Sequence, residues 1–282
     1  MKNMKIRRMG FGFFRYLVLA ILMVWICFPF FWTLLSSFKP AEEIFAIRGG
    51  IWPSYFTLKN YIWVFNNMDF LLTLKNSLIV SIFTALFSVL ICIMFAYSLN
   101  KYNYPGKKLL VNALIVSQML PGVLIIIPIF VVFARLRLVN TLSGLVIAYS
   151  TFSLPFSVLM LRGYLNSLPQ SLEEAALIDG CSRFGAFWRI TFPLIMPGII
   201  AVFLFCFILA WNDFLFALIL THDNEARTVA VQLYNIATVQ FAAGQWGGIM
   251  AESIIFTIPV VVVFVILQKN LVEGLTGGAV KF

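Results

Sequence analysis

The sequence predicts an all-α integral membrane protein with six transmembrane helices and cytoplasmic N- and C-termini. Two properties of the whole chain predict this class: 62% of its 282 residues are hydrophobic and 11% are charged, and the mean hydropathy is +0.98. A soluble core of this size cannot bury so much apolar surface, so lipid must act as the solvent. The third observation is a series of charge-free runs, five of which exceed the roughly 20 residues that a spanning helix needs.

These runs place the spans in order along a single transmembrane domain, 1–282, without repeats or linkers. The fifth run continues past Asp213 because Phe214–Leu220 is again apolar, and the sixth is long enough only if Glu252 is tolerated near one end. The predicted spans are approximately 16–38, 76–100, 109–134, 138–161, 195–220 and 247–268. A cytoplasmic loop, 163–194, lies between the fourth and fifth spans, and a cytoplasmic tail, 269–282, follows the sixth.

The orientation follows from the lysines and arginines, which are retained on the cytoplasmic side. With the N-terminus inside, the inner segments carry 13 of these residues and the outer segments carry 7. The net charge of +9 therefore reports topology and contact with anionic lipid, and it does not indicate a nucleic-acid partner.

Several other classes of protein are disfavoured by what the chain contains. The first apolar run is too long for a signal peptide and lacks a small-x-small cleavage site, so it should be a retained helix. The four cysteines have neither metal nor disulfide spacing, and His222, the single histidine, has no partners for catalysis or ligation. We therefore expect no catalytic, cofactor-binding or metal site.

The first outer segment, 39–75, is dense in aromatic residues, which usually lie at the headgroup level of a membrane. An interfacial helix around Leu58–Asn67 and a docking surface for an external protein both fit it. Prolines within the spans, such as Pro121 and Pro155, indicate kinked helices in a packed bundle.

The loop 163–194 contains the clearest local signals. Ser171 and Glu174 fit a capping box, which predicts a helix from Leu172, and Gly180 is placed to end it with a positive φ. Ser182 then caps a second helix that Pro193 and Pro197 close. From these features alone, a passive amphipathic hairpin on the inner membrane surface remains a slightly favoured alternative to a docking site.

The spacing within this loop also resembles a known family. Its residues match the EAA loop of permease subunits of binding-protein-dependent ABC importers in type and spacing: Glu174, Ala175, Ala176, Asp179, Gly180, Ile190, Pro193, Leu194 and Pro197. Three further stretches resemble the maltose-type sugar permeases: FPFFWTLLSSFKP (28–40), AWNDFLFALIL (210–220) and GLTGGAVK (274–281). The resemblance thus covers nearly the whole chain and implies the type I ABC importer permease fold.

The resemblance further implies which residues couple transport to ATP. In that family the EAA loop is a coupling helix that docks in a cleft of the cytoplasmic ATPase, and the tail reaches the same interface. Carried over by position, the ATPase-coupling residues are Glu173, Glu174, Ala175, Ala176, Leu177, Asp179 and Gly180. The family also implies a second, similar permease subunit, an ATPase dimer and an external solute-binding protein in a prokaryotic plasma membrane, the inner membrane if the cell is Gram-negative.

Two acidic residues stand within the predicted spans. Such an acid normally faces a bundle interior or a watery cavity. Asp213, with Trp211 and Asn212, is the candidate for the translocation path, and a helix-to-helix hydrogen bond is the equally weighted alternative. The role of Glu252 is left open, while the polar outer segment 221–248 is implied to face the solute-binding protein.

The favoured function is therefore a permease subunit for a sugar or oligosaccharide. The chain has no GxxxxGK[ST] loop, so ATP and Mg²⁺ should be bound by the partner ATPase and this subunit should catalyse nothing. Alternatives are an ABC permease for a polyol, glycerol phosphate or peptide and, from another class, a secondary transporter. A secondary transporter usually carries more intramembrane acids than this chain does.

Overall fold

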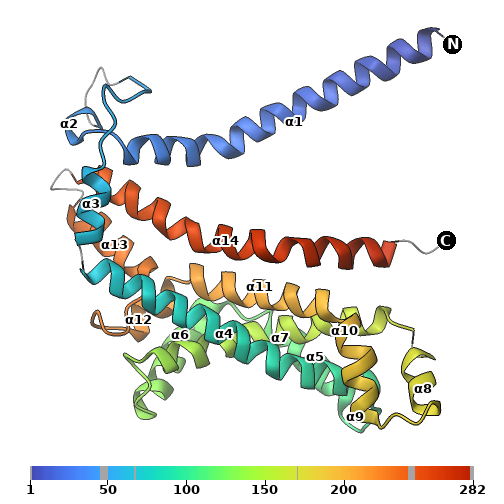
Figure 1. The fold of residues 1–282 in the computed structure, drawn as a ribbon. Coiled ribbons are helices and arrows are strands. Elements are labelled where there is room, and N and C mark those ends of the chain that lie inside the picture. Colours follow the sequence, from blue (N-terminus) through green and yellow to red (C-terminus); the bar gives the residue numbers. More distant parts are fainter. Residues whose placement is uncertain (1, 45–49, 67, 170, 241–244, 280–282) are drawn as a thin grey trace. The chain divides into compact units, whose positions relative to one another are not determined.

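The computed structural model describes residues 2–44, 50–66, 68–169, 171–240 and 245–279. Every regular element in these ranges is a helix, which confirms the all-α class. The chain divides into two units, unit 1 (Met1–Asn67 and Leu233–Thr257) and unit 2 (Met68–Gln232 and Ile258–Phe282). Each unit is described separately below, with the helices labelled as in Figure 1.

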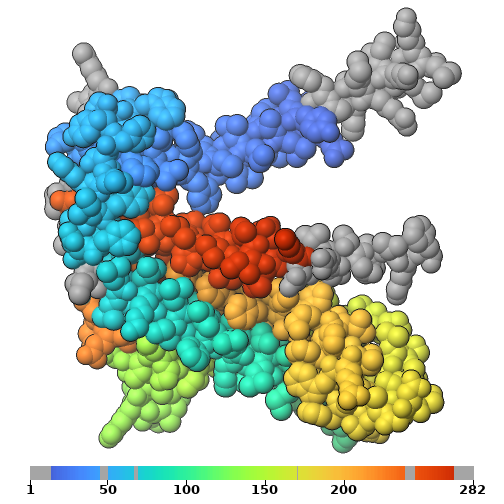
Figure 2. Space-filling model, in the orientation of Figure 1, coloured from blue at the N-terminus to red at the C-terminus, as the bar shows by residue number. Residues whose placement is uncertain are grey.

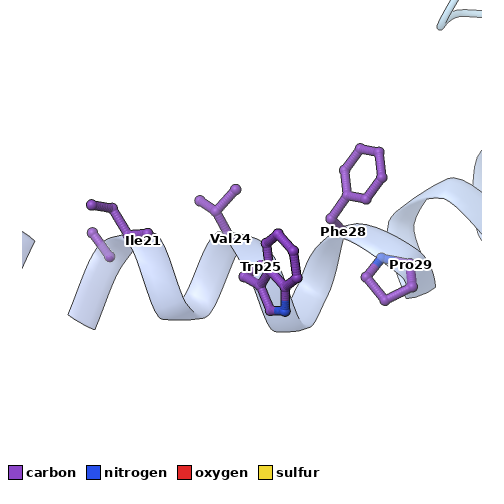
Figure 3. Close-up of a pocket in the computed structure, with 6 residues that line it drawn as sticks. Ile21, Val24, Trp25, Phe28 and Pro29 are labelled. Carbon is purple, nitrogen blue, oxygen red and sulfur yellow. The ribbon is translucent and has the colours of Figure 1, made fainter. Parts of the chain in front are cut away.

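Helix α1 (Lys2–Ser37) in unit 1 is apolar on all sides from Tyr16 onward. Its side chains from Phe14 onward are largely exposed, and Trp25 reaches 77% exposure. An open pocket lies along this helix, lined by Ala20 and by the side chains labelled in Figure 3: Ile21, Val24, Trp25, Phe28 and Pro29. A helix that is hydrophobic all round is stable only against lipid or another apolar surface, as expected of a first span.

The outer segment of unit 1 folds back onto the end of α1. Helix α3 (Lys59–Asn66) forms where the interfacial helix was expected, and the short α2 (Ala41–Ile44) precedes it. The Asn60 amide donates to the carbonyls of Ser37 and Lys39, at 2.8 and 3.0 Å, and so satisfies acceptors that the end of α1 leaves free. The described residues 50–66 of this segment are therefore tied to the end of α1 through Asn60.

Unit 2 is built on three long helices, α4 (Met68–Lys101), α7 (Leu142–Ser167) and α11 (Met196–Asn212). Small polar residues let them approach closely and bond to one another. The hydroxyls of Ser88 and Ser153 share a hydrogen bond of 2.9 Å between α4 and α7, and Ser157 lies 3.3 Å from the Cys206 sulfur between α7 and α11.

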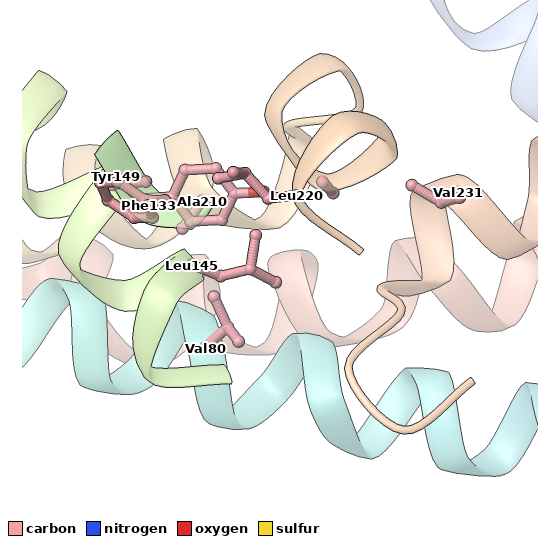
Figure 4. Packing of buried hydrophobic residues seen from close by; sticks show 9 residues of the cluster. Val80, Phe133, Leu145, Tyr149, Ala210, Leu220 and Val231 are labelled. Carbon is pink, nitrogen blue, oxygen red and sulfur yellow. The ribbon is translucent and has the colours of Figure 1, made fainter. Parts of the chain in front are cut away.

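An apolar cluster closes one end of this bundle (Figure 4). Tyr149 on α7 and Val80 on α4 lie in it beside Leu220 of the short helix α12 (Leu215–Leu220). Its remaining buried members are Phe133, Leu145, Ala148, Ala210, Ala217 and Val231. The cluster positions the chain break at the end of α11, where the predicted path residues lie.

The expected third span, 109–134, is not one continuous helix. Helix α5 (Lys107–Ser117) and helix α6 (Gly122–Arg135) meet at an angle of 104°. Pro121 causes the break, because it has no amide hydrogen and adopts an extended conformation, ψ 122°, immediately before α6. The predicted kink at Pro121 is confirmed, whereas the expectation of one continuous span over 109–134 is replaced by two helices that meet at a sharp angle.

The C-terminal third also differs from the expectation in detail. The polar segment 221–248 contains helix α13 (Val229–Gln240), so it is more structured than a loop, and residues 241–244 lie outside the described residues. Helix α14 (Trp246–Ala279) includes the expected sixth span and most of the expected tail, 269–282. Residues 280–282 of that tail also lie outside the described residues.

Four helices of the described residues are long and apolar enough to cross a membrane: Phe14–Ser37, Asp69–Lys101, Leu142–Ser167 and Trp246–Lys269. Two bent pairs bring the number to six if each pair is one span: Lys107–Ser117 with Gly122–Arg135, and Arg183–Leu194 with Met196–Asn212. The second pair bends by 68° and joins the fifth expected span to the loop before it.

Candidate functional site

Helix α8 (Ser171–Ile178) forms in the loop and begins within one residue of the predicted start. Its end is a Schellman motif, in which the Cys181 amide donates to the Ala176 carbonyl at 3.0 Å and the Gly180 amide donates to the Leu177 carbonyl at 3.2 Å. Gly180 has the predicted positive φ, +85°. The chain therefore leaves α8 through a defined turn.

A second helical segment follows at once. The Ser182 hydroxyl accepts from the Gly185 amide at 3.1 Å, as the predicted cap of α9 (Arg183–Ala186). A π-helical turn, η1 (Phe187–Thr191), and α10 (Phe192–Leu194) continue it. Pro193 was expected to close this helix, but it lies within the first positions of α10, where its missing amide is tolerated. The chain bends afterwards, at Ile195.

These segments form one end of unit 2, shown in yellow and gold in Figure 2. The predicted coupling residues divide between two faces of α8. Glu174, Ala175, Asp179 and Gly180 are exposed, whereas Glu173 and Ala176 are buried and Leu177 is intermediate. The predicted set is therefore not one surface.

One exposed residue of this helix was missed. Ile178 is 86% exposed, the most exposed large hydrophobic side chain of the described residues. It lies one helical turn from Glu174 and continues the outward face. The sequence did carry a signal for Ile178, namely an apolar residue on the side of the helix that faces away from the core. It was missed because the EAA-loop pattern contains the neighbours of Ile178 but not Ile178 itself.

The buried face of α8 is attached to the rest of unit 2 through Glu173. Its carboxylate accepts a hydrogen bond from the Tyr97 hydroxyl at 2.7 Å and pairs with the Lys101 ammonium at 3.3 Å. Both partners belong to the last turns of α4. The sequence placed Glu173 beside Glu174 in the first turn, but the two carboxylates face different surroundings.

The predicted path residues lie at the other end of the bundle, where α11 stops. Trp211 is 1% exposed and stacks on Phe207, with ring centroids 5.8 Å apart. Asn212 is exposed and its amide donates to the Ile208 carbonyl at 3.0 Å. The three residues therefore do not share one surface.

Asp213 is held by hydrogen bonds within unit 2. Its Oδ1 accepts from the Tyr149 hydroxyl at 2.9 Å and from the amides of Phe216 and Ala217 at 3.0 and 3.2 Å. This carboxylate thus caps α12 and ties it to α7. The geometry matches the alternative of a structural hydrogen bond, and a role for Asp213 in the path stays a prediction.

Two asparagines that sequence reasoning missed fix the segment after α12. Asn76 of α4 donates to the carbonyls of Asn224, Glu225 and Arg227 at 3.0–3.3 Å. Asn140, with φ 60°, donates through its amide side chain to Asp223 at 2.7 Å. Their partners lie far away in the chain, so no local sequence signal marks them.

Glu252 of α14 remains without an assigned role. Its side chain is fully buried, and neither carboxylate oxygen has a hydrogen-bond partner among the described residues. Because it lies within an expected span, an uncompensated charge there would be costly.

Comparison with known proteins gives the family. Residues 88–277 match the family described as "binding-protein-dependent transport system inner membrane component". The inner membrane ABC transporter permease protein YcjP of Escherichia coli is 35% identical over 97% of this chain and 96% of its own length. The trehalose/maltose transport system permease protein MalG of Thermococcus litoralis is 38% identical over 93% and 94%, respectively.

Two further similarities agree with this. The diacetylchitobiose uptake system permease protein DasC of Streptomyces coelicolor is 33% identical over 93% of this chain and 94% of its own. A chain of a bacterial ABC transporter involved in the import of alginate has the same fold, with a TM-score of 0.79 and 22% identity over 92% of this chain and 95% of that one. These matches confirm the ABC importer permease fold, and the chain belongs to the family of binding-protein-dependent transport system inner membrane components.

Proposed function

We propose that this protein is a membrane-spanning permease subunit of an ATP-driven importer that takes up a sugar or oligosaccharide. An external solute-binding protein delivers the cargo, and a second, similar permease completes the passage. ATP and Mg²⁺ are bound by a separate ATPase dimer on the cytoplasmic side of a prokaryotic plasma membrane. The subunit itself transmits motion and catalyses no reaction.

The outward face of α8 is the single observation that carries this proposal. Ile178 is 86% exposed next to the exposed Glu174 and Asp179, on a helix ended by the Gly180 turn. An exposed apolar side chain flanked by charged residues is typical of a surface that a protein partner covers. A cleft of the ATPase is that partner, and its movement on ATP binding displaces α8.

The nature of the cargo rests on the relatives. Permeases named for diacetylchitobiose, for trehalose and maltose, and for sulfoquinovosyl glycerol each align with more than nine-tenths of this chain. All three names denote a saccharide or a glycoside. This supports a sugar over a polyol, glycerol phosphate or peptide.

Co-purification tests the coupling surface. The chain is expressed with its second permease and ATPase, and Ile178→Asp is compared with Leu58→Asp, since Leu58 is an exposed apolar residue of the outer segment, outside the helices that cross the membrane. We expect Ile178→Asp to reduce the bound ATPase by about tenfold or more, which corresponds to the loss of one interface anchor. Equal ATPase recovery for wild type and Ile178→Asp would contradict the docking role of α8.

Transport assays test the importer itself. Proteoliposomes that contain both permeases and the ATPase should transport sugar only under two conditions. ATP must be present on the side of the membrane where the ATPase lies, and the binding protein must be present on the opposite side. Titration of the purified binding protein with sugars, polyols and peptides identifies the cargo class. Uptake by this chain alone, without ATPase, would support a secondary transporter and refute the proposal.

A further inference from the structure

The two adjacent glutamates at the start of α8 differ in their surroundings. Glu174 is exposed, whereas Glu173 is 9% exposed and is surrounded by residues of its own chain. Since successive helical positions point about 100° apart, one of the pair can face outward while the other faces the bundle. Glu173 and Glu174 have the same side chain, but their different surroundings allow them different roles.

Glu173 is bonded to the end of α4. The Tyr97 hydroxyl donates to Oε1 at 2.7 Å, and the Lys101 ammonium lies 3.3 Å from Oε2. Tyr97 and Lys101 are one helical turn apart on the same helix, so two groups of α4 hold one carboxylate. A hydrogen bond to a charged group is stronger than a neutral one and has a defined direction.

The same carboxylate also reaches the second helical segment of the loop. The Thr191 hydroxyl donates to Oε2 at 3.4 Å, from the last residue of η1. Tyr97 packs edge-on against Phe187 of η1, with ring centroids 4.8 Å apart. Helices α4 and α8 and the turn η1 thus converge on Glu173.

These contacts argue against Glu173 as a docking residue. Both of its oxygens are already engaged, and its side chain would have to leave a partly buried ion pair in order to reach another protein. Separating such a pair strands a charge without its partner, which is strongly unfavourable. The outward residues of α8 can make the external contacts while Glu173 stays bound.

We propose that Glu173 is the positioning residue through which displacement of α8 is transmitted to α4. This inference rests on the proposed function, because an ATPase must move α8 for the connection to matter. Helix α4 runs from Lys101 along the length of unit 2 and bonds to α7 at Ser88 (Figure 1). A pull at its Lys101 end is therefore passed to the bundle by a rigid element.

The test measures uptake per ATP hydrolysed in the reconstituted importer. Glu173→Gln keeps the volume and the acceptor for Tyr97 but removes the ion pair with Lys101. We expect it to retain the ATPase and its hydrolysis, while uptake per ATP falls about fivefold or more, in the range typical of coupling between sites. Glu174→Gln, on the outward face, should instead reduce the amount of ATPase recovered.

A matched pair of lysines serves as a second arm if Glu173→Gln folds poorly. Lys101→Met removes the same ion pair by changing its more exposed partner, and it should lower uptake per ATP to a similar extent. Lys107→Met is the control, since Lys107 bonds only locally among the described residues, to Tyr102 and Asn103. The double variant of Glu173 and Lys101 should be no worse than either single one.

Each other outcome overturns the inference. Unchanged uptake per ATP in both Glu173→Gln and Lys101→Met, with or without lower protein yield, makes Glu173 a residue of stability alone. Loss of ATPase from Glu173→Gln, as from Glu174→Gln, makes it a docking residue. A wild-type chain that recruits no ATPase refutes the proposed function as well, which separates that failure from the first two.

Discussion

At the scale of single residues, Gly180 is the position where backbone conformation alone decides the effect of a substitution. Its φ is +85°, and an added Cβ would meet no atom within 4 Å, so crowding plays no part. A β-branched residue in this conformation costs about 1–2 kcal/mol or more, and the Schellman turn would rearrange.

We therefore predict that Gly180→Val lowers sugar uptake about fivefold or more while the protein inserts at normal yield. Gly180→Asn is the control, because asparagine tolerates positive φ and should retain most of the uptake. Uptake assays in cells, normalised to the amount of membrane protein, measure both. Normal uptake by Gly180→Val would mean that the turn does not matter for coupling.

Asp213 is the second residue whose role the structure sharpens. Because its Oδ1 accepts from Tyr149 and from two amides of α12, Asp213→Ala should destabilise the protein by about 0.5–2 kcal/mol. Asp213→Asn retains an oxygen acceptor and should stay close to wild type. Thermal unfolding in detergent, followed by size-exclusion chromatography, compares the two.

The same pair of variants separates structure from transport. If Asp213→Asn assembles and melts normally but loses uptake, then the carboxylate charge matters to the passage and capping does not explain the residue. If both Asp213→Ala and Asp213→Asn transport normally once assembled, the prediction that Asp213 lines the translocation path is wrong.

At the scale of helices, close packing between α7 and α11 gives a further prediction. A Cβ added at Gly198 would lie 2.7 Å from the Tyr164 ring, whereas one added at Gly163 would meet nothing within 4 Å. Overpacking of this kind costs about 1–3 kcal/mol, while alanine in an open helical position is favourable by about 0.5–1 kcal/mol.

Gly198→Ala should therefore lower the melting midpoint, and Gly163→Ala should leave it unchanged or raise it. Both residues lie within segments of unit 2 that contact each other, so a general effect of alanine would move the two midpoints alike. That result would contradict the packing explanation.

At the scale of helices, some features of the fold could be predicted from the sequence and others could not. The Gly180 turn and the Ser182 cap were predictable, since both depend on residues within a few positions of each other. A kink at Pro121 was also predictable, but its size, 104° between α5 and α6, was not, because a proline marks where a helix can break and not how far the chain turns there. The π-helical η1 likewise follows from packing and has no local signature.

The candidate site shows the same division. The outward position of Glu174 follows from helical periodicity, but the burial of Glu173 depends on Tyr97, which is 76 positions away in the chain. Periodicity shows that adjacent glutamates point in different directions, but nothing in SLEEAALIDG says which of the two is bonded to another helix. Contacts over such distances are set by the fold, and so the two roles could be separated only in three dimensions.

At the scale of the whole molecule, the orientation in the membrane is the property on which the coupling proposal depends. Helix α8 can meet an ATPase only if it lies on the cytoplasmic side. The 13 lysines and arginines in the inner segments, against 7 in the outer ones, predict that it lies there, because positive charges are held on that side during insertion. Leu58 in the outer segment should then lie on the opposite face.

Two cysteine substitutions test this in a background where Cys27, Cys92, Cys181 and Cys206 are replaced. Leu58→Cys and Ile178→Cys are suitable because the native side chains are 62% and 86% exposed, so that reactivity reports the side of the membrane and not burial. The chain is expressed without its ATPase, which would otherwise cover position 178. In intact cells, a membrane-impermeant maleimide should then label position 58 alone, and permeabilised cells should be labelled at both. Labelling of position 178 in intact cells would place α8 outside, where no ATP-driven partner could move it.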